Sequence, residues 1–325
     1  MVSPETVLTS ARYGKDKVRL FRVVRQGGFH QVVEYNVTVL LEGDIASSYT
    51  EADNAVVVAT DSMKNITYYL AKVSSHILIP ERFALHLGTH IVSKYSHITR
   101  AFITIEKLRW SRIPVGANGQ EKPHPHSFVR DGDDKRVVQA KVEKKNGEGT
   151  LTANVSAGIV DLLVLKSTGS AFTGFIRDEY TTLVEVDDRI FSTSVDLSYS
   201  FSPIIIPIPN ADNKFLDFDV PASAATGDGD VWDSEGVAER ARTATLDIFA
   251  TDESASVQAT LYKMAQRVIG ENAGVESVTY KLPNKHYIPV DMKYIGVDNM
   301  TPSVAEVFVP VSAPSGLISA TISCK

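Results

Sequence analysis

Residues 18–41 read VRLFRVVRQGGFHQVVEYNVTVLL, and their pattern decides the fold class. From Gln31 to Leu41, apolar residues alternate with polar ones at the period of a strand that buries one face. Gly27-Gly28 separates this run from an apolar run at Val18–Arg25, where a tight turn would join two strands. The stretch therefore predicts an antiparallel hairpin with one buried face.

Two helices and further strands are predicted after the hairpin. Apolar residues recur at helical spacing in two stretches, and the second begins near Pro80, a residue that suits a first helical turn. The expected buried faces consist of Ile66, Tyr69, Leu70 and Val73 in one helix and of Phe83, Leu87, Ile91 and Tyr95 in the other. Strand patterns resume at residues 101–112 and 123–128.

The second half of the chain repeats this plan. Its expected strands are residues 136–145, 150–165, 275–292 and 306–322, with a turn at Asn146-Gly147, and its expected helices are residues 237–250 and 254–269. Each half thus reads hairpin, helices, hairpin, which predicts a duplicated α+β domain with antiparallel sheets. We expect a first domain at residues 1–134 and a second at residues 135–325, with a surface insertion near residues 203–232.

The composition is that of an ordinary globular protein. The chain has 325 residues, of which 43% are hydrophobic and 22% charged, with a net charge of -6. This acidic balance argues against a nucleic-acid partner, and the lack of a long apolar run argues against a membrane partner. The single cysteine, Cys324, excludes an internal disulfide and a cysteine-rich metal site.

Familiar catalytic motifs are absent from the sequence. It contains no glycine-rich dinucleotide or phosphate loop, no His-Glu-x-x-His and no Gly-x-Ser-x-Gly. His124 and His126 would point the same way from an extended segment, but a metal site needs a third or fourth ligand, and none is apparent nearby. We therefore expect structural histidines and no bound metal.

The stretch from Leu165 to Arg189 carries the residues that suggest a ligand. It combines an aromatic ring at Phe172, a flexible Gly174, an apolar side chain at Leu183 and the guanidinium of Arg189. A planar anion needs such a set, because the ring can stack on its face and the guanidinium can pair with its edge. The alternative is a charged surface loop in which Arg189 forms a salt bridge.

Several segments of the sequence are informative when taken together. They are Tyr13-Gly14-Lys15, Val58-Ala59-Thr60-Asp61-Ser62, Leu165-Lys166-Ser167-Thr168, Arg177-Asp178-Glu179-Tyr180-Thr181-Thr182-Leu183, Ser256-Val257-Gln258-Ala259-Thr260, Leu282-Pro283-Asn284-Lys285-His286-Tyr287 and Gly316-Leu317-Ile318. Together they resemble those of one family, the urate oxidases (uricases), with most likeness to its fungal members. They follow in order over nearly the whole chain, except at residues 203–232. The resemblance implies tandem tunnelling-fold (T-fold) domains, assembled as a homotetramer with active sites at subunit interfaces.

The resemblance also assigns substrate-binding roles. Phe172 would stack on the flat urate ring, while Arg189 and Gln258 would clamp one edge. The remaining expected contacts are the main chain of Val257, the apolar wall of Leu183, Thr60 and Asp61 from a neighbouring subunit, and Asn284, which would hold O₂, water or peroxide over the ring. Taken alone, these residues read as a core phenylalanine, a surface arginine, a solvated glutamine and a helix-capping aspartate.

The implied catalytic residues are Lys15, Thr60 and His286. Lys15 would act as a base and relay protons through the Thr60 hydroxyl, and His286 would extend the relay. Taken alone, Lys15 is a surface lysine and His286 a strand histidine. The implied reaction oxidises urate with O₂ and water to 5-hydroxyisourate and hydrogen peroxide, without a cofactor.

The resemblance leaves location and two other functions open. The family is commonly peroxisomal in eukaryotes, but the C-terminal Ile322-Ser323-Cys324-Lys325 is not a Ser-Lys-Leu signal, so the cytoplasm is the alternative. A pterin or GTP-ring hydrolase of the same fold would anchor a purine-like edge with a carboxylate, whereas this chain offers Arg189 and Gln258. A catalytically silent purine-binding protein would keep the fold without the oxidation.

Overall fold

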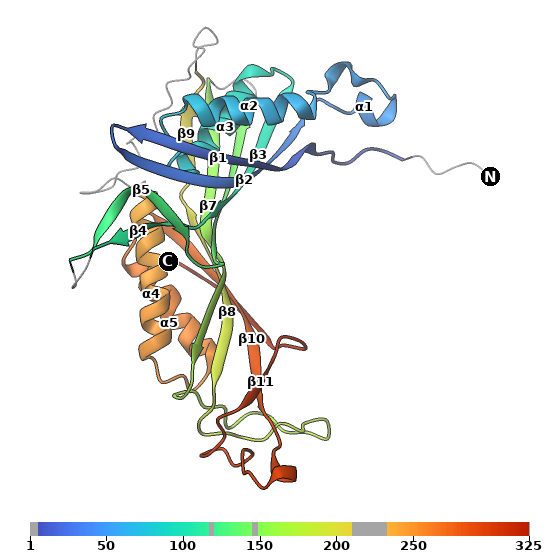
Figure 1. The fold of residues 1–325 in the computed structure, drawn as a ribbon. Coiled ribbons are helices and arrows are strands. Elements are labelled where there is room, and N and C mark those ends of the chain that lie inside the picture. The colour runs from blue at the N-terminus through green and yellow to red at the C-terminus, as the bar shows by residue number, and fades with distance from the viewer. Residues whose placement is uncertain (1–5, 117–119, 145–148, 210–232, 325) are drawn as a thin grey trace. The chain divides into compact units, whose positions relative to one another are not determined.

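The computed structural model describes residues 6–116, 120–144, 149–209 and 233–324. The chain forms two compact units. The first unit is Met1–Gly158 with Ser200–Gly236, and the second unit is Ile159–Tyr199 with Val237–Lys325. In each unit helices pack on an antiparallel sheet (Figure 1), which confirms the α+β class. The tandem division at residue 134 stays a prediction.

The first unit has its strands in the order β1-β2-β3-β6-β7. These are β1 (Tyr13–Gln26), β2 (Phe29–Gly43), β3 (Ile98–Leu108), β6 (Lys135–Lys144) and β7 (Thr150–Lys166), and β9 (Ile204–Pro207) also pairs with β7. Helices α2 (Thr60–Val73) and α3 (Pro80–Lys94) pack on β1, β3 and β6 (Figure 1). The smaller elements are α1 (Ser47–Thr50), the 3-10 helix η1 (Asn54–Val56) and a separate hairpin of β4 (Trp110–Val115) and β5 (Lys122–Arg130).

The hairpin predicted at residues 18–41 is confirmed and is longer than predicted. β1 pairs with β2 from Gln26 and Phe29 next to the turn to Tyr13 and Leu41 at the far end. Gly27 in the turn has a φ of 60°, a left-handed value that glycine adopts without strain.

A bulge interrupts β1 between Lys15 and Val18, where Lys17 has a φ of 53°. Lys15 pairs with Val39 before the bulge, and Val18 pairs with Val37 after it, so two residues of β1 face one residue of β2. Directly paired residues of antiparallel strands share a face of the sheet, and both Val37 and Val39 are buried. Lys15 therefore lies on the face that the helices cover.

The core of the first unit lies between this face and the helices. Most inward positions predicted for β2 and α3 are buried, namely Val33, Tyr35, Val37, Val39, Leu41, Phe83, Leu87 and Ile91. Tyr95, also predicted for the buried face of α3, caps the C-terminus of that helix and is half-buried. The buried face of α2 differs from the predicted one. It consists of Met63, Thr67, Leu70 and Ala71, while Tyr69 and Val73 are exposed. The sequence pattern missed this because Thr67 carries a hydroxyl, which bonds to the Met63 carbonyl within the helix at 2.9 Å.

A buried ion pair joins α3 to the sheet. Glu81 in the first turn of α3 is fully buried, and Arg136 Nη2 on β6 lies 2.6 Å from its Oε1. Burial raises the pKa of Glu81, and the charge of Arg136 opposes that rise. Because losing one partner would leave a buried charge unpaired, this pair fixes α3 on the sheet.

The second unit has strands in the order β7-β8-β10-β11, and β12 also pairs with β10. Its elements are the end of β7, β8 (Phe191–Phe201), α4 (Ser234–Thr251), α5 (Val257–Gly270), β10 (Val275–Pro289), the 3-10 helix η3 (Lys293–Ile295), β11 (Phe308–Val311) and β12 (Leu317–Ser323). α5 packs on β10 and β12 through its predicted stripe of Val257, Leu261, Met264 and Val268, all buried. No helix among the described residues is long and apolar enough to cross a bilayer.

Four parts of the chain differ from the sequence-based prediction. The predicted strand at residues 101–112 covers the end of β3 and the start of β4, which belong to different sheets. β8 was not predicted, although Val195, Leu197, Tyr199 and Phe201 alternate with polar residues as in a half-buried strand; only at its start, Phe191–Thr193, are successive residues all buried. The predicted strand at residues 306–322 is two strands, β11 and β12. The expected insertion at residues 203–232 begins with β9, whose Ile204 and Ile206 are buried against β7. Residues 210–232 and the turn predicted at Asn146-Gly147 lie outside the described residues.

We predict that Gly14→Ala destabilises the protein through the β1–β2 pairing. A Cβ at Gly14 would lie 1.9 Å from the Val39 carbonyl oxygen, so the strands would have to separate. The expected loss is about 1–3 kcal/mol in the free energy of unfolding, measured by urea denaturation. Gly28→Ala is the control, because a Cβ at Gly28 has no atom within 4 Å. Equal stability of the two variants would contradict the prediction.

Candidate functional site

The residues selected from the sequence fall into two groups, one on each unit. Lys15, Thr60 and Asp61 belong to the first unit, and Phe172, Leu183, Arg189, Val257, Gln258, Asn284 and His286 belong to the second unit. Within each group, hydrogen bonds and electrostatic interactions link most of these residues or their immediate neighbours.

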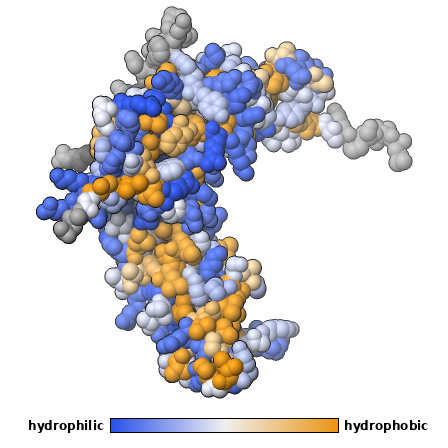
Figure 2. Space-filling model, in the orientation of Figure 1, coloured by the Kyte–Doolittle hydropathy of each residue, from blue (hydrophilic) through white to orange (hydrophobic). Residues whose placement is uncertain are grey.

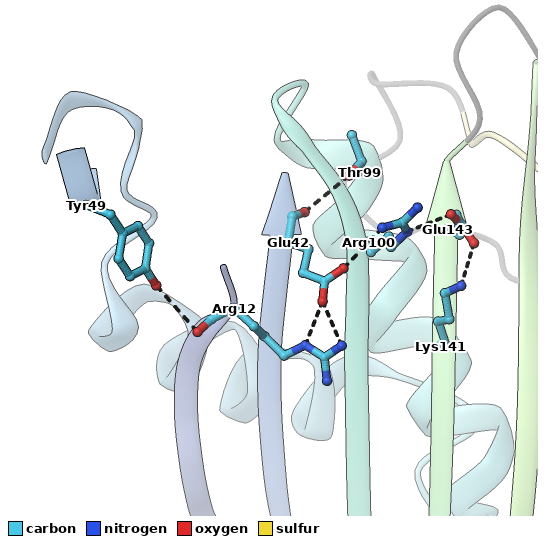
Figure 3. Close-up of polar contacts among 7 residues, drawn as sticks. All are labelled: Arg12, Glu42, Tyr49, Thr99, Arg100, Lys141 and Glu143. Atoms are coloured by element: carbon cyan, nitrogen blue, oxygen red, sulfur yellow. Dashed lines mark hydrogen bonds and ion pairs between the residues drawn. The ribbon is translucent and has the colours of Figure 1, made fainter. Parts of the chain in front are cut away.

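In the first unit, the chain is fastened to the sheet three residues before Lys15. Arg12 donates from Nε and Nη2 to Glu42 Oε1 at 2.8 and 2.6 Å, and Tyr49 donates its hydroxyl to the Arg12 carbonyl at 3.4 Å (Figure 3). Arg100 lies between the carboxylates of Glu42 and Glu143 and continues this charge network across the strands (Figure 3). The network fixes where β1 begins.

Tyr13 then joins β1 to the segment that leads into α2. Its hydroxyl accepts a hydrogen bond from the Val58 amide at 2.7 Å. α2 begins two residues later with Thr60, so Thr60 and Asp61 form its first turn next to β1. Sequence reasoning quoted Tyr13 within a motif but did not assign this role to it. The spacing of two residues between Tyr13 and Lys15 could have indicated it, because residues two apart on a strand lie on the same face.

Asp61 and Lys15 interact electrostatically. Asp61 accepts hydrogen bonds from Lys64 at 2.5 Å and from Asn65 at 2.9 Å. The hydrogen bond from Lys64 holds the pKa of Asp61 below its ordinary value, and the charge of Lys15 acts in the same direction. The N-cap of α2 is Ala59, so the alternative reading of Asp61 as a helix cap is wrong. Lys15 on β1 and Thr60 and Asp61 at the start of α2 are thus half-buried or exposed polar residues on two elements that pack together.

In the second unit, three short segments form a small sheet that we call the clamp sheet, made of residues 169–172, 186–189 and 252–254. Phe172 and Val186 exchange backbone hydrogen bonds of 2.8 and 3.1 Å, and Arg189 N donates to the Ser170 carbonyl at 2.9 Å. On the other side, the amides of Ala171 and Ser254 donate to the carbonyls of Ser254 and Gly169 at 3.0 Å each. The clamp sheet brings Phe172 and Arg189 to the start of α5.

The guanidinium of Arg189 is not paired with a carboxylate among the described residues. It is half-buried, and its Cζ lies 5.1 Å from the centroid of the Phe172 ring. Its buried Nε has no hydrogen-bond partner among the described residues, and within them Arg189 has no ion pair. Burial lowers the pKa of Arg189, yet a guanidinium stays charged at neutral pH. The alternative of a salt-bridged surface arginine therefore finds no support in the described part of the chain.

The start of α5 adds donors beside this cation. Ser256 caps the helix by accepting from the Ala259 amide at 3.1 Å, so Val257 and Gln258 are its first two helical residues. The first amides of a helix have no intrahelical partner and lie at the positive end of the helix dipole. The Val257 side chain is buried, so only its main chain can meet a ligand, while the Gln258 side chain is exposed.

Asn284 and His286 lie where β10 changes its neighbour. β10 pairs with β12 up to Pro283 and with β11 from His286 onward, and the Asn284 amide donates to the Gly316 carbonyl at 2.7 Å. Two residues apart on a strand, the side chains of Asn284 and His286 share a face. The change of partner leaves both side chains half-buried or exposed.

The last predicted contact, Leu183, lies in a loop. Its side chain is 51% exposed, and Arg177 donates from Nη1 to its carbonyl at 2.7 Å.

His124 and His126 lie in the first unit, with ring centroids 4.5 Å apart. Among the described residues, no group of three or more His, Cys, Asp or Glu side chains is placed to hold a metal ion.

Comparison with known proteins gives a consistent result. The chain matches the family described as Uricase over residues 11–141 and 155–319. It is 43% identical to a uricase of Aspergillus flavus over 98% of this chain and 97% of that protein. It is 38% identical to a uricase of Schizosaccharomyces pombe over the full length of both. Its structure resembles the crystal structure of uricase from Arthrobacter globiformis, with a TM-score of 0.80, 33% identity, and coverage of 99% of this chain and 96% of that chain.

Proposed function

The chain belongs to the uricase family and is a urate oxidase with an α+β T-fold, and from this premise we propose how its own residues bind and oxidise urate. Urate is flat, anionic at neutral pH and rimmed with carbonyl and N–H groups. It therefore needs a stacking surface, a cation and paired donors at one edge. The observation that carries the proposal is the open guanidinium of Arg189 beside the Phe172 ring.

We propose that the clamp sheet and the start of α5 hold urate. Phe172 stacks on the ring, and Arg189 and Gln258 bond one edge in the two-pronged manner of guanidinium and amide groups. The Val257 main chain adds a donor, and the exposed Leu183 supplies an apolar wall. This arrangement favours an oxidase over a hydrolase of the same fold, which would anchor the edge with a carboxylate.

We propose that the polar group of the first unit moves protons. Lys15 acts as a general base, the Thr60 hydroxyl relays the proton, and Asp61 holds the opposite edge of urate. His286 extends the relay, and Asn284 holds O₂, water or peroxide through its amide. The packing of α2 on β1, with Thr60 and Asp61 in the first turn of α2, supports their acting together.

We propose that urate itself supplies the electrons. Once deprotonated, the electron-rich ring passes two electrons to O₂, which leaves as hydrogen peroxide after taking two protons. Water then adds to the oxidised ring to give 5-hydroxyisourate. The reaction balances as urate, O₂ and water on one side and 5-hydroxyisourate and peroxide on the other, without an added cofactor.

We propose a homotetramer whose active sites combine the first-unit group of one subunit with the second-unit group of its neighbour. The second unit carries exposed apolar side chains on its strands, and Figure 2 shows apolar surface gathered over this unit. They include Leu163, Leu165, Ile288, Val309 and Leu317. Such surfaces mark protein–protein contacts, and closed rings pair open sheet edges. A peroxisomal location stays a prediction from family resemblance, with the cytoplasm as the alternative.

We predict that the purified protein consumes urate with O₂ after exhaustive dialysis against a chelator. The expected result is equal molar loss of urate and O₂ and equal appearance of peroxide, followed by ultraviolet absorbance, an oxygen electrode and a peroxidase assay. Loss of activity on chelation that a single metal restores would contradict cofactor independence. An inert chain that still binds urate would identify the silent purine-binding alternative.

We predict that substitutions separate binding from chemistry. Arg189→Ala should weaken urate binding by about 1.5–3 kcal/mol, because a charge-assisted contact is lost in both the ground state and the transition state. Lys15→Ala should lower turnover by roughly 10²–10⁴-fold and leave anaerobic urate binding nearly unchanged. The double variant of Lys15 and Thr60 should be little worse than the poorer single variant, because the two act as one relay.

The control for these measurements is Lys72→Ala, which removes an exposed lysine at the end of α2. Full turnover of Lys15→Ala would show that Lys15 is a surface lysine. Losses that multiply in the double variant would show that Lys15 and Thr60 act independently.

We predict that two impaired variants restore each other when urate is well below the KM of the Arg189→Ala variant. In a tetramer reassembled from Lys15→Ala and Arg189→Ala subunits, some sites receive an intact first unit from one variant and an intact second unit from the other. The recovered activity should rise with the mixing ratio to a maximum near equal amounts. Mass spectrometry of the mixture checks that mixed tetramers have formed. Mixed tetramers without activity would contradict shared sites.

A further inference from the structure

Asp188 precedes Arg189 in the chain, but its carboxylate bonds in another direction. Oδ2 accepts the Thr168 hydroxyl at 2.5 Å, and Oδ1 accepts the amides of Gly169 at 2.7 Å and of Ser170 at 3.4 Å. The side chain is exposed, so these hydrogen bonds rather than burial hold it in place.

The backbone at Gly169 makes this arrangement possible. Gly169 has a φ of 80°, in the left-handed region that glycine adopts without strain. A residue in this conformation lets successive amides turn toward one anion, which is how backbone nests bind carboxylates. The Thr168 hydroxyl adds the third donor. Residues 168–170 thus form a small receptor for the Asp188 carboxylate.

Residues 188 and 189 both form hydrogen bonds to the segment that begins the clamp sheet, residues 168–170. Asp188 bonds to Thr168, Gly169 and Ser170 through its side chain, and the Arg189 amide bonds to the Ser170 carbonyl at 2.9 Å. The chain bends at Asp187 and Asp188. The Asp188 carboxylate bonds to the 168–170 segment, while the Arg189 guanidinium lies by the Phe172 ring.

This placement keeps the Asp188 carboxylate away from the Arg189 guanidinium, which in the proposed function pairs with the urate anion. A free aspartate next to Arg189 could pair with its guanidinium and compete with the substrate. The hydrogen bond from Thr168 lowers the pKa of Asp188, and the backbone amides act in the same direction. Its bonds are therefore fully formed at neutral pH, and they are lost only as the pH falls through the lowered pKa.

We propose that Asp188 is a positioning residue for urate binding, which holds the Arg189 side chain beside Phe172 through the receptor at residues 168–170. This inference rests on the proposed role of Arg189 in the substrate clamp. Asp188 does not touch urate in this scheme. Its effect passes through the clamp sheet, so it should appear in substrate binding and not in the proton transfers.

The experiment measures anaerobic urate binding by calorimetry and, separately, KM and kcat in air. Asp188→Ala and Thr168→Val should each weaken urate binding and raise KM, by on the order of tenfold for the first and several-fold for the second, with kcat changed less than about twofold. Thr168→Ser keeps the hydroxyl and should bind as the parent does. Asp188→Asn keeps an acceptor and should restore most of the affinity lost in Asp188→Ala.

The matched control is Glu306→Gln, which removes the same charge from an exposed side chain of the second unit outside the clamp sheet and should leave binding and turnover unchanged. Urate binding by Asp188→Ala at parental affinity would overturn the proposal. So would a reduced number of binding sites with an unchanged dissociation constant, because that result marks a purely structural role. If Asp188→Ala does not fold, the Thr168 pair decides the question, and equal affinity of its valine and serine forms overturns the proposal.

Failure of the underlying function would look different. A parent protein that neither binds urate anaerobically nor consumes it in air would refute the proposed function itself. Parental affinity in Arg189→Ala would refute the role of Arg189, whatever the Asp188 variants do.

Discussion

Burial of one sheet face under two helices is the constraint on which the rest of each unit depends. Helices that pack across a sheet begin near the edge of their covered face, and their first turns lie beside strand ends. In the first unit α2 begins at Thr60 beside β1, and in the second unit α5 begins at Val257 beside the clamp sheet. Both groups of site residues therefore include a helix start, where unpaired amides and the helix dipole favour anionic groups.

Two largely buried or half-buried arginines, Arg136 and Arg189, differ in whether a carboxylate pairs with them. Arg136 is paired with the fully buried Glu81, so its charge stabilises the attachment of α3 to the sheet. Arg189 lies half-buried with an unpartnered Nε, while the neighbouring carboxylate is bound by backbone amides and a hydroxyl. An unpaired cation lowers stability, and only a ligand that pairs with it recovers the lost interaction. The contrast separates an arginine that stabilises the fold from one that we propose binds the substrate.

Periodicity predicted the β1–β2 hairpin and the stripe of α5, whose buried positions are apolar. It gave the wrong face for α2, where Thr67 buries a polar side chain that hydrophobic spacing does not register. β8 was not predicted, although its residues from Val195 to Phe201 alternate between apolar and polar. The site residues were identified from resemblance to a family, since single residues such as Lys15 are unremarkable by themselves. The receptor for Asp188 could not be predicted, because it depends on a left-handed backbone angle at Gly169 and on contacts between distant segments.

The bulge in β1 decides which side chains of that strand lie on the face that the helices cover. Tyr13 and Lys15 are odd-numbered and Val18 and Leu20 are even-numbered, yet their β2 partners are all buried residues of the same face. The extra residue between Lys15 and Val18 shifts the alternation by one. A regular ladder through the same residues would pair Asp16 with Val39 and turn Lys15 to the opposite face, with every side chain still present. The bulge is thus as much a determinant of the proposed proton relay as the identity of the lysine.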